Sequence, residues 1–231
     1  MKKMIAILAG LALLMAAPLA LAEGEATLTV TGTGVVTLTP DYVTLNLGVN
    51  TQAETVTAAQ EKNAALMNAL VDALMARGIA KEDIQTNYFS INPVYDYGSM
   101  SIASDTPMGY RVDNSLLVIV RDLNAVSQTL DAAVKAGANQ SYGLTFESTQ
   151  KAAAYDQALK NAAAEAARKA GVLAEASGKS LGDLQKMAEQ TGGYRGEYAS
   201  ILNMADSGRG APIMSGTLSV EASVEMTYSL K

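Results

Sequence analysis

Residues 42–53 read YVTLNLGVNTQA, a segment in which apolar and polar side chains alternate. The odd-numbered positions from 43 to 49 carry only Val and Leu, and the even-numbered positions carry Thr, Asn and Gly. Successive side chains of a strand point to opposite faces of the sheet. The segment is therefore predicted to be a strand with one buried and one polar face, which is typical of an antiparallel sheet.

A helix is predicted directly after this strand, over residues 55–77, because its apolar residues recur at helical spacing. Two further helices are predicted over 122–136 and 149–177, and each of the three is followed by a glycine that can end it. Strands are predicted over 27–39, 84–95, 110–121, 142–148, 181–190 and 216–230. Together these elements predict an α+β fold: an antiparallel sheet with three main helices packed on one side.

Four segments carry finer expectations. Gly32 and Gly34 predict a bulge or bend in the first strand. The unbroken apolar run 116–120 predicts a central strand that is covered on both faces. The apolar stripe of the third helix is mostly Ala, which lets this helix lie close against its neighbour. The segments 96–109 and 192–215 are predicted to be long loops.

The composition excludes several kinds of active site. The 231 residues include no Cys and no His, which excludes a Ser-His-Asp triad, a Cys nucleophile and a metal site built from His and Cys. Hydrophobic residues make up 49% and charged residues 17%, as in a globular protein. We assign no catalytic, cofactor-binding or metal-ligating residue, and we predict that the protein is not an enzyme and holds no cofactor.

The first 22 residues are predicted to be a cleaved signal peptide. Two lysines precede an apolar run, and an A-x-A cleavage site ends at Ala22. The run is shorter than the ~20 residues that span a bilayer. The mature chain 23–231 has 15 basic and 23 acidic residues, a net charge of −8. We expect an exported protein with no stable membrane insertion and no nucleic-acid partner, since nucleic-acid binding needs basic clusters.

Short motifs in a fixed order run through most of the mature chain. They are Thr31-Gly32-Thr33-Gly34, Pro40-Asp41, Gly78-Ile79, Asp83-Ile84-Gln85-Thr86, Pro93-Val94-Tyr95, Gly109-Tyr110-Arg111, Val118-Ile119-Val120-Arg121-Asp122, Leu130-Asp131-Ala132-Ala133-Val134, Gly137-Ala138-Asn139, Gly143-Leu144-Thr145-Phe146 and Lys169-Ala170. Their order and spacing resemble the SIMPL-domain family of exported bacterial proteins. The chain is thus interpreted as a signal peptide, residues 1–22, and a SIMPL domain, residues 23–231.

The resemblance implies an α+β fold and a periplasmic or secreted location. It also implies a homo-oligomer, because some members are described as large ring-like assemblies. Some relatives are linked to tolerance of oxidative stress, and the resemblance implies the same link here. The family brings no established catalytic residues, so none is carried over to this chain.

Two pairs of carboxylates are candidates for acid–base or cation chemistry. Glu82 and Asp83 are adjacent just after a helix end, where a solvated turn is expected instead. Glu221 and Glu225 share one face of the last strand, with Ser223 between them. An ordinary solvent-exposed strand face is expected there rather than a cation site.

Two other positions invite a functional interpretation. Gly32-Thr33-Gly34 lacks the third glycine and the following helix of a dinucleotide fingerprint, so phosphate binding is not expected. Asn63 falls on the apolar stripe of its helix. It is predicted to be a buried, hydrogen-bonded residue that fixes packing, and a place at the edge of the stripe is the alternative.

Tyrosines and methionines gather in and near the two long loops. The tyrosines either form an interface or anchor the loops, and both interpretations stay open; they are Tyr88, Tyr95, Tyr97, Tyr110, Tyr194 and Tyr198. The methionines either scavenge oxidants or fill gaps in the packing; they are Met100, Met108, Met204 and Met214.

The leading hypothesis is a non-enzymatic, exported protein of the cell envelope that assembles with itself through the last strand and the tyrosine-bearing loops. The alternative is a small-ligand binder or an enzyme that uses carboxylates and Tyr in a cleft between helices and sheet. A third possibility is an adhesin-like surface module, which only export and acidity support.

Overall fold

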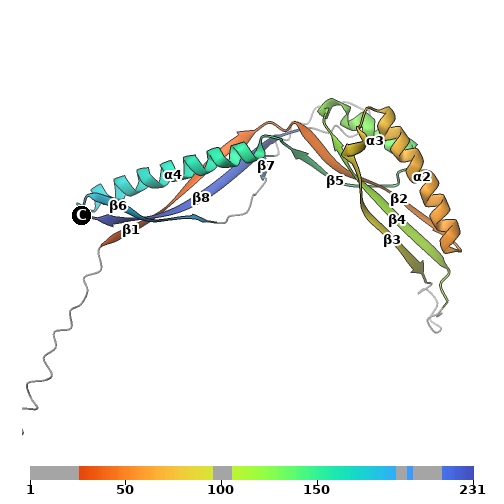
Figure 1. The fold of residues 1–231 in the computed structure, drawn as a ribbon, viewed down its shortest axis with the longest axis horizontal. Coiled ribbons are helices and arrows are strands. Elements are labelled where there is room, and N and C mark those ends of the chain that lie inside the picture. The colour runs from red at the N-terminus through yellow and green to blue at the C-terminus, as the bar shows by residue number, and fades with distance from the viewer. Residues whose placement is uncertain (1–25, 96–105, 191–196, 200–214) are drawn as a thin grey trace, which may run out of the picture.

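The computed structural model describes residues 26–95, 106–190, 197–199 and 215–231. Within them the chain forms two antiparallel sheets, one toward each end of an elongated molecule (Figure 1). The predicted signal peptide and most of the two predicted loops lie outside the described residues. The predicted α+β class with antiparallel pairing is confirmed, whereas the division of the strands into two sheets is a feature that the sequence did not predict.

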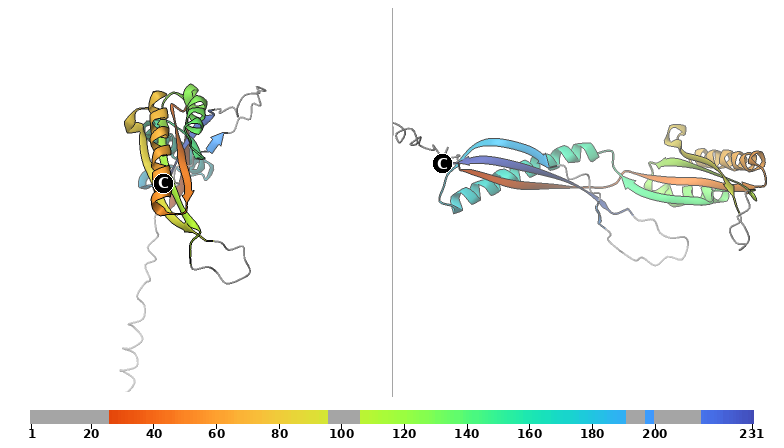
Figure 2. Two further views of the ribbon diagram at one scale, coloured as in Figure 1. Left: turned by 90° about the vertical axis from the view of Figure 1, so that its right-hand side faces the viewer. Right: turned by 90° about the horizontal axis from the view of Figure 1, so that it is seen from below.

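The first sheet contains strands from both ends of the chain. Its central strand β8 (Thr217–Leu230) pairs with β1 (Thr27–Leu38) along one side. On the other side it pairs with β6 (Leu181–Gln190) and the short β7 (Glu197–Ala199). Helix α4 (Lys151–Ala176) runs along β1 and β8 and covers one face of this sheet (Figures 1 and 2).

Helix α4 lies close to β1 because neither element has bulky side chains where they meet. The buried stripe of the helix is Ala at every fourth position from Ala154 to Ala174. A Cβ atom added to Gly34 would lie 2.0 Å from the carbonyl oxygen of Ala158, and one added to Gly32 would meet Ala162 in the same way. The small residues of the two elements are therefore matched to each other.

The expectations for this region are confirmed in part. The close approach of an Ala-rich helix is confirmed, since all six alanines of the buried stripe are at most 5% exposed. The predicted bulge or bend at Gly32 and Gly34 is wrong, because β1 pairs with β8 along its whole length without a shift of register. The two glycines make room for α4.

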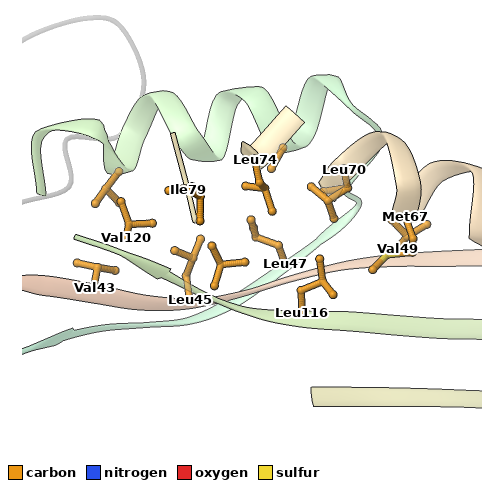
Figure 3. Close-up of a cluster of buried hydrophobic side chains, with 14 residues drawn as sticks. Val43, Leu45, Leu47, Val49, Met67, Leu70, Leu74, Ile79, Leu116 and Val120 are labelled. Carbon is orange, nitrogen blue, oxygen red and sulfur yellow. The ribbon is translucent and has the colours of Figure 1, made fainter. Parts of the chain in front are cut away.

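The second sheet has the strand order β3–β4–β2–β5. These strands are β2 (Tyr42–Ala53), β3 (Ile84–Val94), β4 (Gly109–Val120) and β5 (Gln140–Glu147). Helices α2 (Val56–Ala76) and α3 (Val126–Lys135) contribute to the core on one face, and two short 3-10 turns, Lys81–Asp83 and Leu123–Ala125, complete it. Figure 3 shows this core, where Leu45 and Leu47 of β2 meet Leu70 and Leu74 of α2.

The predicted centre of the sheet is confirmed, since β4 lies between β3 and β2. The expectation that β4 is covered on both faces is wrong. Leu116 and Val118 are buried under the helices, but Leu117 and Ile119 on the opposite face are only half-buried. The face of the second sheet that lies away from α2 and α3, here called the open face, is therefore accessible.

The chain passes between the two sheets at two neighbouring places, after β1 and before α4. Asp41 joins them: its backbone N–H donates to Glu147 O at 2.9 Å, and its carboxylate accepts the hydroxyl of Thr149 at 2.6 Å. The Thr149 hydroxyl lowers the pKa of Asp41 from its ordinary value of 3.8. Because the folded pKa is the lower one, this stabilisation is present above the ordinary value and is lost as the pH falls through the folded value.

Candidate functional site

The open face of the second sheet carries a cluster of polar and aromatic side chains. All four strands contribute to it, because every second residue of each strand points to this face. The polar positions that define the 42–53 pattern are part of the cluster. Its members are Asn46, Gly48 and Asn50 of β2, Asn87 and Tyr88 of β3, Asp113 and Ser115 of β4, and Gln140 and Tyr142 of β5.

Gly48 forms the floor of this cluster. The register places Tyr88, Ser115, Gly48 and Gln140 side by side across the four strands. A Cβ atom on Gly48 would lie 3.0 Å from the Gln140 Oε1 atom, so any side chain here would push against its neighbours. The missing side chain leaves room for the Gln140 amide, and beside it a hollow lies between Tyr88 on one edge strand and Tyr142 on the other.

Both edge strands are irregular at the level of this hollow. The pairing of β3 shifts between Thr86 and Tyr88, and that of β5 shifts just after Tyr142. Gly143 at the second shift has φ +65°, a conformation that other residues rarely adopt. Bulges of this kind redirect side chains and are frequent beside binding sites.

Hydrogen bonds hold the floor of the hollow in place. The Ser115 hydroxyl donates to Asn87 Oδ1 at 2.6 Å and lies 3.2 Å from the Tyr142 hydroxyl. The amide of Asn87 in turn donates to Asn46 Oδ1. These contacts link β5, β4, β3 and β2 through side chains alone.

Asp113 supplies the carboxylate of the site. Its Oδ1 atom accepts the amide of Asn50 at 2.5 Å and that of Gln140 at 3.1 Å. Asn50 is itself fixed by Asn139, whose side chain exchanges two hydrogen bonds with the Asn50 backbone, at 2.7 and 2.8 Å. No hydrogen bond within the described residues uses the Oδ2 atom of Asp113, which remains able to accept one from a ligand.

The hollow is an open pocket of about 470 Å³. Its volume lies within the range of small-molecule sites. The lining residues, which define what we call the open-face pocket, are Tyr88, Asp113, Asn139, Gln140, Ser141 and Tyr142. The arrangement can hold a small polar molecule.

The pocket lies in a different place from the predicted cleft. The alternative hypothesis placed carboxylates and Tyr in a cleft between the helices and the sheet, but that space is filled by the apolar core. Of these lining residues, only Tyr88 was a candidate from the sequence, and no pattern gave a site role to Asp113, Asn139, Gln140 or Tyr142. The one available signal was the polar face of the 42–53 segment, which looks like an ordinary solvent-exposed face.

The two carboxylates of the first predicted pair lie in different environments. Glu82 is exposed in a turn, as expected, but the expectation of a solvated Asp83 is wrong: this residue is buried and accepts both Nε and Nη2 of Arg121, at 2.9 and 2.7 Å. The hydrogen bonds that Arg121 donates to Asp83 raise the pKa of Arg121. Asp83 therefore fixes the turn before β3.

The other predicted positions are an accessible strand face and a buried packing residue. Glu221 and Glu225 lie on the face of the first sheet away from α4, where Glu221 is exposed and Glu225 half-buried. Asn63 is buried and donates to Val49 O at 2.8 Å and Val112 O at 3.3 Å, which confirms the predicted packing role. No group of three or more Asp and Glu residues in the described part of the chain could hold a metal ion.

The tyrosines and methionines of the predicted loops are described only in part. Tyr95 and Met108 are exposed, and Tyr110 is half-buried on β4. Tyr198 lies on β7. Tyr97, Tyr194, Met100, Met204 and Met214 lie outside the described residues. Among the described helices, none has the length and apolar character that a bilayer crossing requires.

Comparisons with known proteins give a consistent result. The family model SIMPL, described as a protein of unknown function (DUF541), matches residues 28–228. The 26 kDa periplasmic immunogenic proteins of Brucella melitensis and Brucella abortus are 34% identical over 214 residues, which cover 89% of this chain and 85% of theirs. The uncharacterized protein YggE of Escherichia coli K12 is 27% identical over 194 residues, 84% of this chain and 76% of that protein.

Proposed function

Because the chain belongs to the SIMPL family, we propose that it acts in the cell envelope as a non-enzymatic protein that assembles with copies of itself. Its predicted periplasmic or secreted location is confirmed by the Brucella relatives, whose names describe them as periplasmic. Assembly and the lack of enzymatic activity are our proposals. The apolar edge of the first sheet supports assembly most directly.

This edge consists of Leu173, Leu184 and Met187, which are each about half exposed. Strand β6 has no further partner strand among the described residues. Leu184 and Met187 pair with Tyr228 and Met226, which belong to the core under α4, so they lie on the same side of the sheet as the helix. Exposed apolar side chains on an unpaired edge strand are typical of an association surface.

Leu173 extends the same surface. Tyr155 donates a hydrogen bond to Glu189 of β6, which shows that this line of α4 faces the edge strand. Leu173 comes 18 residues later, a distance of about five full helical turns, and therefore lies on the same line. The apolar edge thus runs across both the helix and β6.

The mature wild-type protein is expected to form a discrete oligomer, and Met187→Glu is expected to reduce its mass. A charge placed on the apolar edge would have to lose its hydration when two copies meet. The measurement is light scattering after size exclusion. Val134→Glu is the matched control, because Val134 is equally exposed on α3 but belongs to the second sheet. A wild-type protein that stays monomeric at all concentrations would contradict the proposal.

We also propose the link to oxidative stress, through reversible oxidation of exposed methionines. Peroxide treatment followed by peptide mass mapping is expected to find sulfoxide at Met108 well before Met67, since Met108 is exposed and Met67 is buried. The oxidised protein should keep its melting temperature, as a protective role requires. Equal rates at Met67, or unfolding on oxidation, would contradict this proposal.

A further inference from the structure

The ring of Tyr142 lies flat across the open face. Its residue is on β5, yet its hydroxyl is 3.2 Å from Ser115 on β4, two strand spacings or about 10 Å away. A tyrosine standing upright on β5 could not make this contact, so the ring crosses β2 between Asn46 and Gly48. Tyr142 is nevertheless 52% exposed, which leaves a face of the ring open to solvent.

A second tyrosine borders the same hollow from the opposite edge strand. Tyr88 on β3 is 53% exposed and pairs with Ser115, the residue that anchors Tyr142. The two tyrosines therefore border a pocket that Asp113, Asn139 and Gln140 also line. Large exposed aromatic rings with polar tips are suited to ligands that have one apolar side and one hydrated side.

The polar groups that remain available in the pocket include two side-chain acceptors. Asp113 Oδ2 and Gln140 Oε1 accept no hydrogen bond from any described residue. The only charged residue in the lining is the carboxylate of Asp113. The carboxylate disfavours anions such as phosphate, and the two acceptor oxygens can take hydrogen bonds from the hydroxyls of a ligand.

From this arrangement we propose that the open-face pocket binds a neutral saccharide. A pyranose ring has an apolar C–H face that can stack on the Tyr142 ring, and equatorial hydroxyls that can donate to Asp113 and Gln140. The acceptor oxygens belong to planar carboxylate and amide groups. Hydrogen bonds with Asn50, which Asn139 holds in turn, keep these groups in one orientation. The pocket lies on the second sheet, so this binding does not depend on the proposed assembly through β6.

The test is calorimetric titration of the mature protein with two neutral trisaccharides, the β-1,4-linked trimer of N-acetylglucosamine and maltotriose. At least one is expected to bind, and Tyr88→Ala should weaken its binding by about tenfold. Phe89→Ala is the matched control, because Phe89 is the next residue on β3 and is equally exposed, at 51%, but points to the other face. It should change the affinity less than about twofold.

Further variants separate binding from folding. Tyr142→Phe keeps the stacking ring and should keep most of the affinity, whereas Tyr142→Ala should lose it. Circular dichroism melts show whether each variant is folded, and light scattering should give the same mass for all of them. The proposal is overturned if neither trisaccharide binds, if Tyr88→Ala and Phe89→Ala weaken binding equally, or if a diamine such as putrescine binds in place of the sugars.

Discussion

Gly34→Ala should lower the free energy of unfolding by about 3 kcal/mol, the upper range for overpacking a close contact. The added Cβ atom would lie 2.0 Å from the carbonyl oxygen of Ala158 and 2.6 Å from the amide nitrogen of Ala162. Both atoms belong to the helix backbone and cannot rotate away, so α4 would have to move off β1. Urea unfolding followed by circular dichroism measures the change.

The control for this substitution is another glycine replaced by the same residue. Gly171 lies within α4, and a Cβ atom built on it meets nothing within 4 Å. Gly171→Ala should therefore stabilise the protein by up to about 1 kcal/mol through helix propensity. If Gly34→Ala proved as stable as the wild-type protein, the close contact between α4 and β1 would be disproved.

Asn63→Leu should destabilise the second sheet by about 3 kcal/mol, since buried groups that lose a hydrogen-bond partner cost roughly 1–3 kcal/mol. The side-chain amide of Asn63 bridges two neighbouring strands through Val49 O and Val112 O. Leu has a similar volume, so the substitution removes the donor without opening a large cavity. Thermal and urea unfolding would both report the loss.

Asn68→Leu on the same helix is the matched control for Asn63→Leu. Asn68 is exposed, so its replacement should change the stability by no more than about 0.5 kcal/mol. Equal effects of the two substitutions would show that helix propensity, rather than the buried bridge, explains the result.

Local patterns predicted most helices and strands of this fold. The alternation of apolar and polar residues predicted β2 and β8. The three glycines that were expected to end helices all have positive φ; they are Gly78, Gly137 and Gly178. The division into two sheets could not be predicted in this way. It depends on which strands pair, and β1 pairs with the last strand rather than with its neighbour β2. Local periodicity carries no information about which distant strands pair.

The open-face pocket was harder to predict than the fold for a related reason. Asp113 and Gln140 lie on strands that are not adjacent in the sheet. Their side chains meet across β2, above Asn50 and Gly48. Each residue alone looks like an ordinary polar position. Gly32 and Gly34 were misinterpreted as a bend because the helix that requires them begins more than a hundred residues later.

The central place of β8 in the first sheet sets an order of events when the chain is made. Strand β1 is synthesised before residues 42–147 and its partner strand β8 after them, so β1 has no partner strand while the second sheet forms. Closing the first sheet also has a high entropic cost, because it joins distant parts of the chain. A chain that stops before β8 would therefore contain a complete second sheet joined to a first sheet that lacks its central strand.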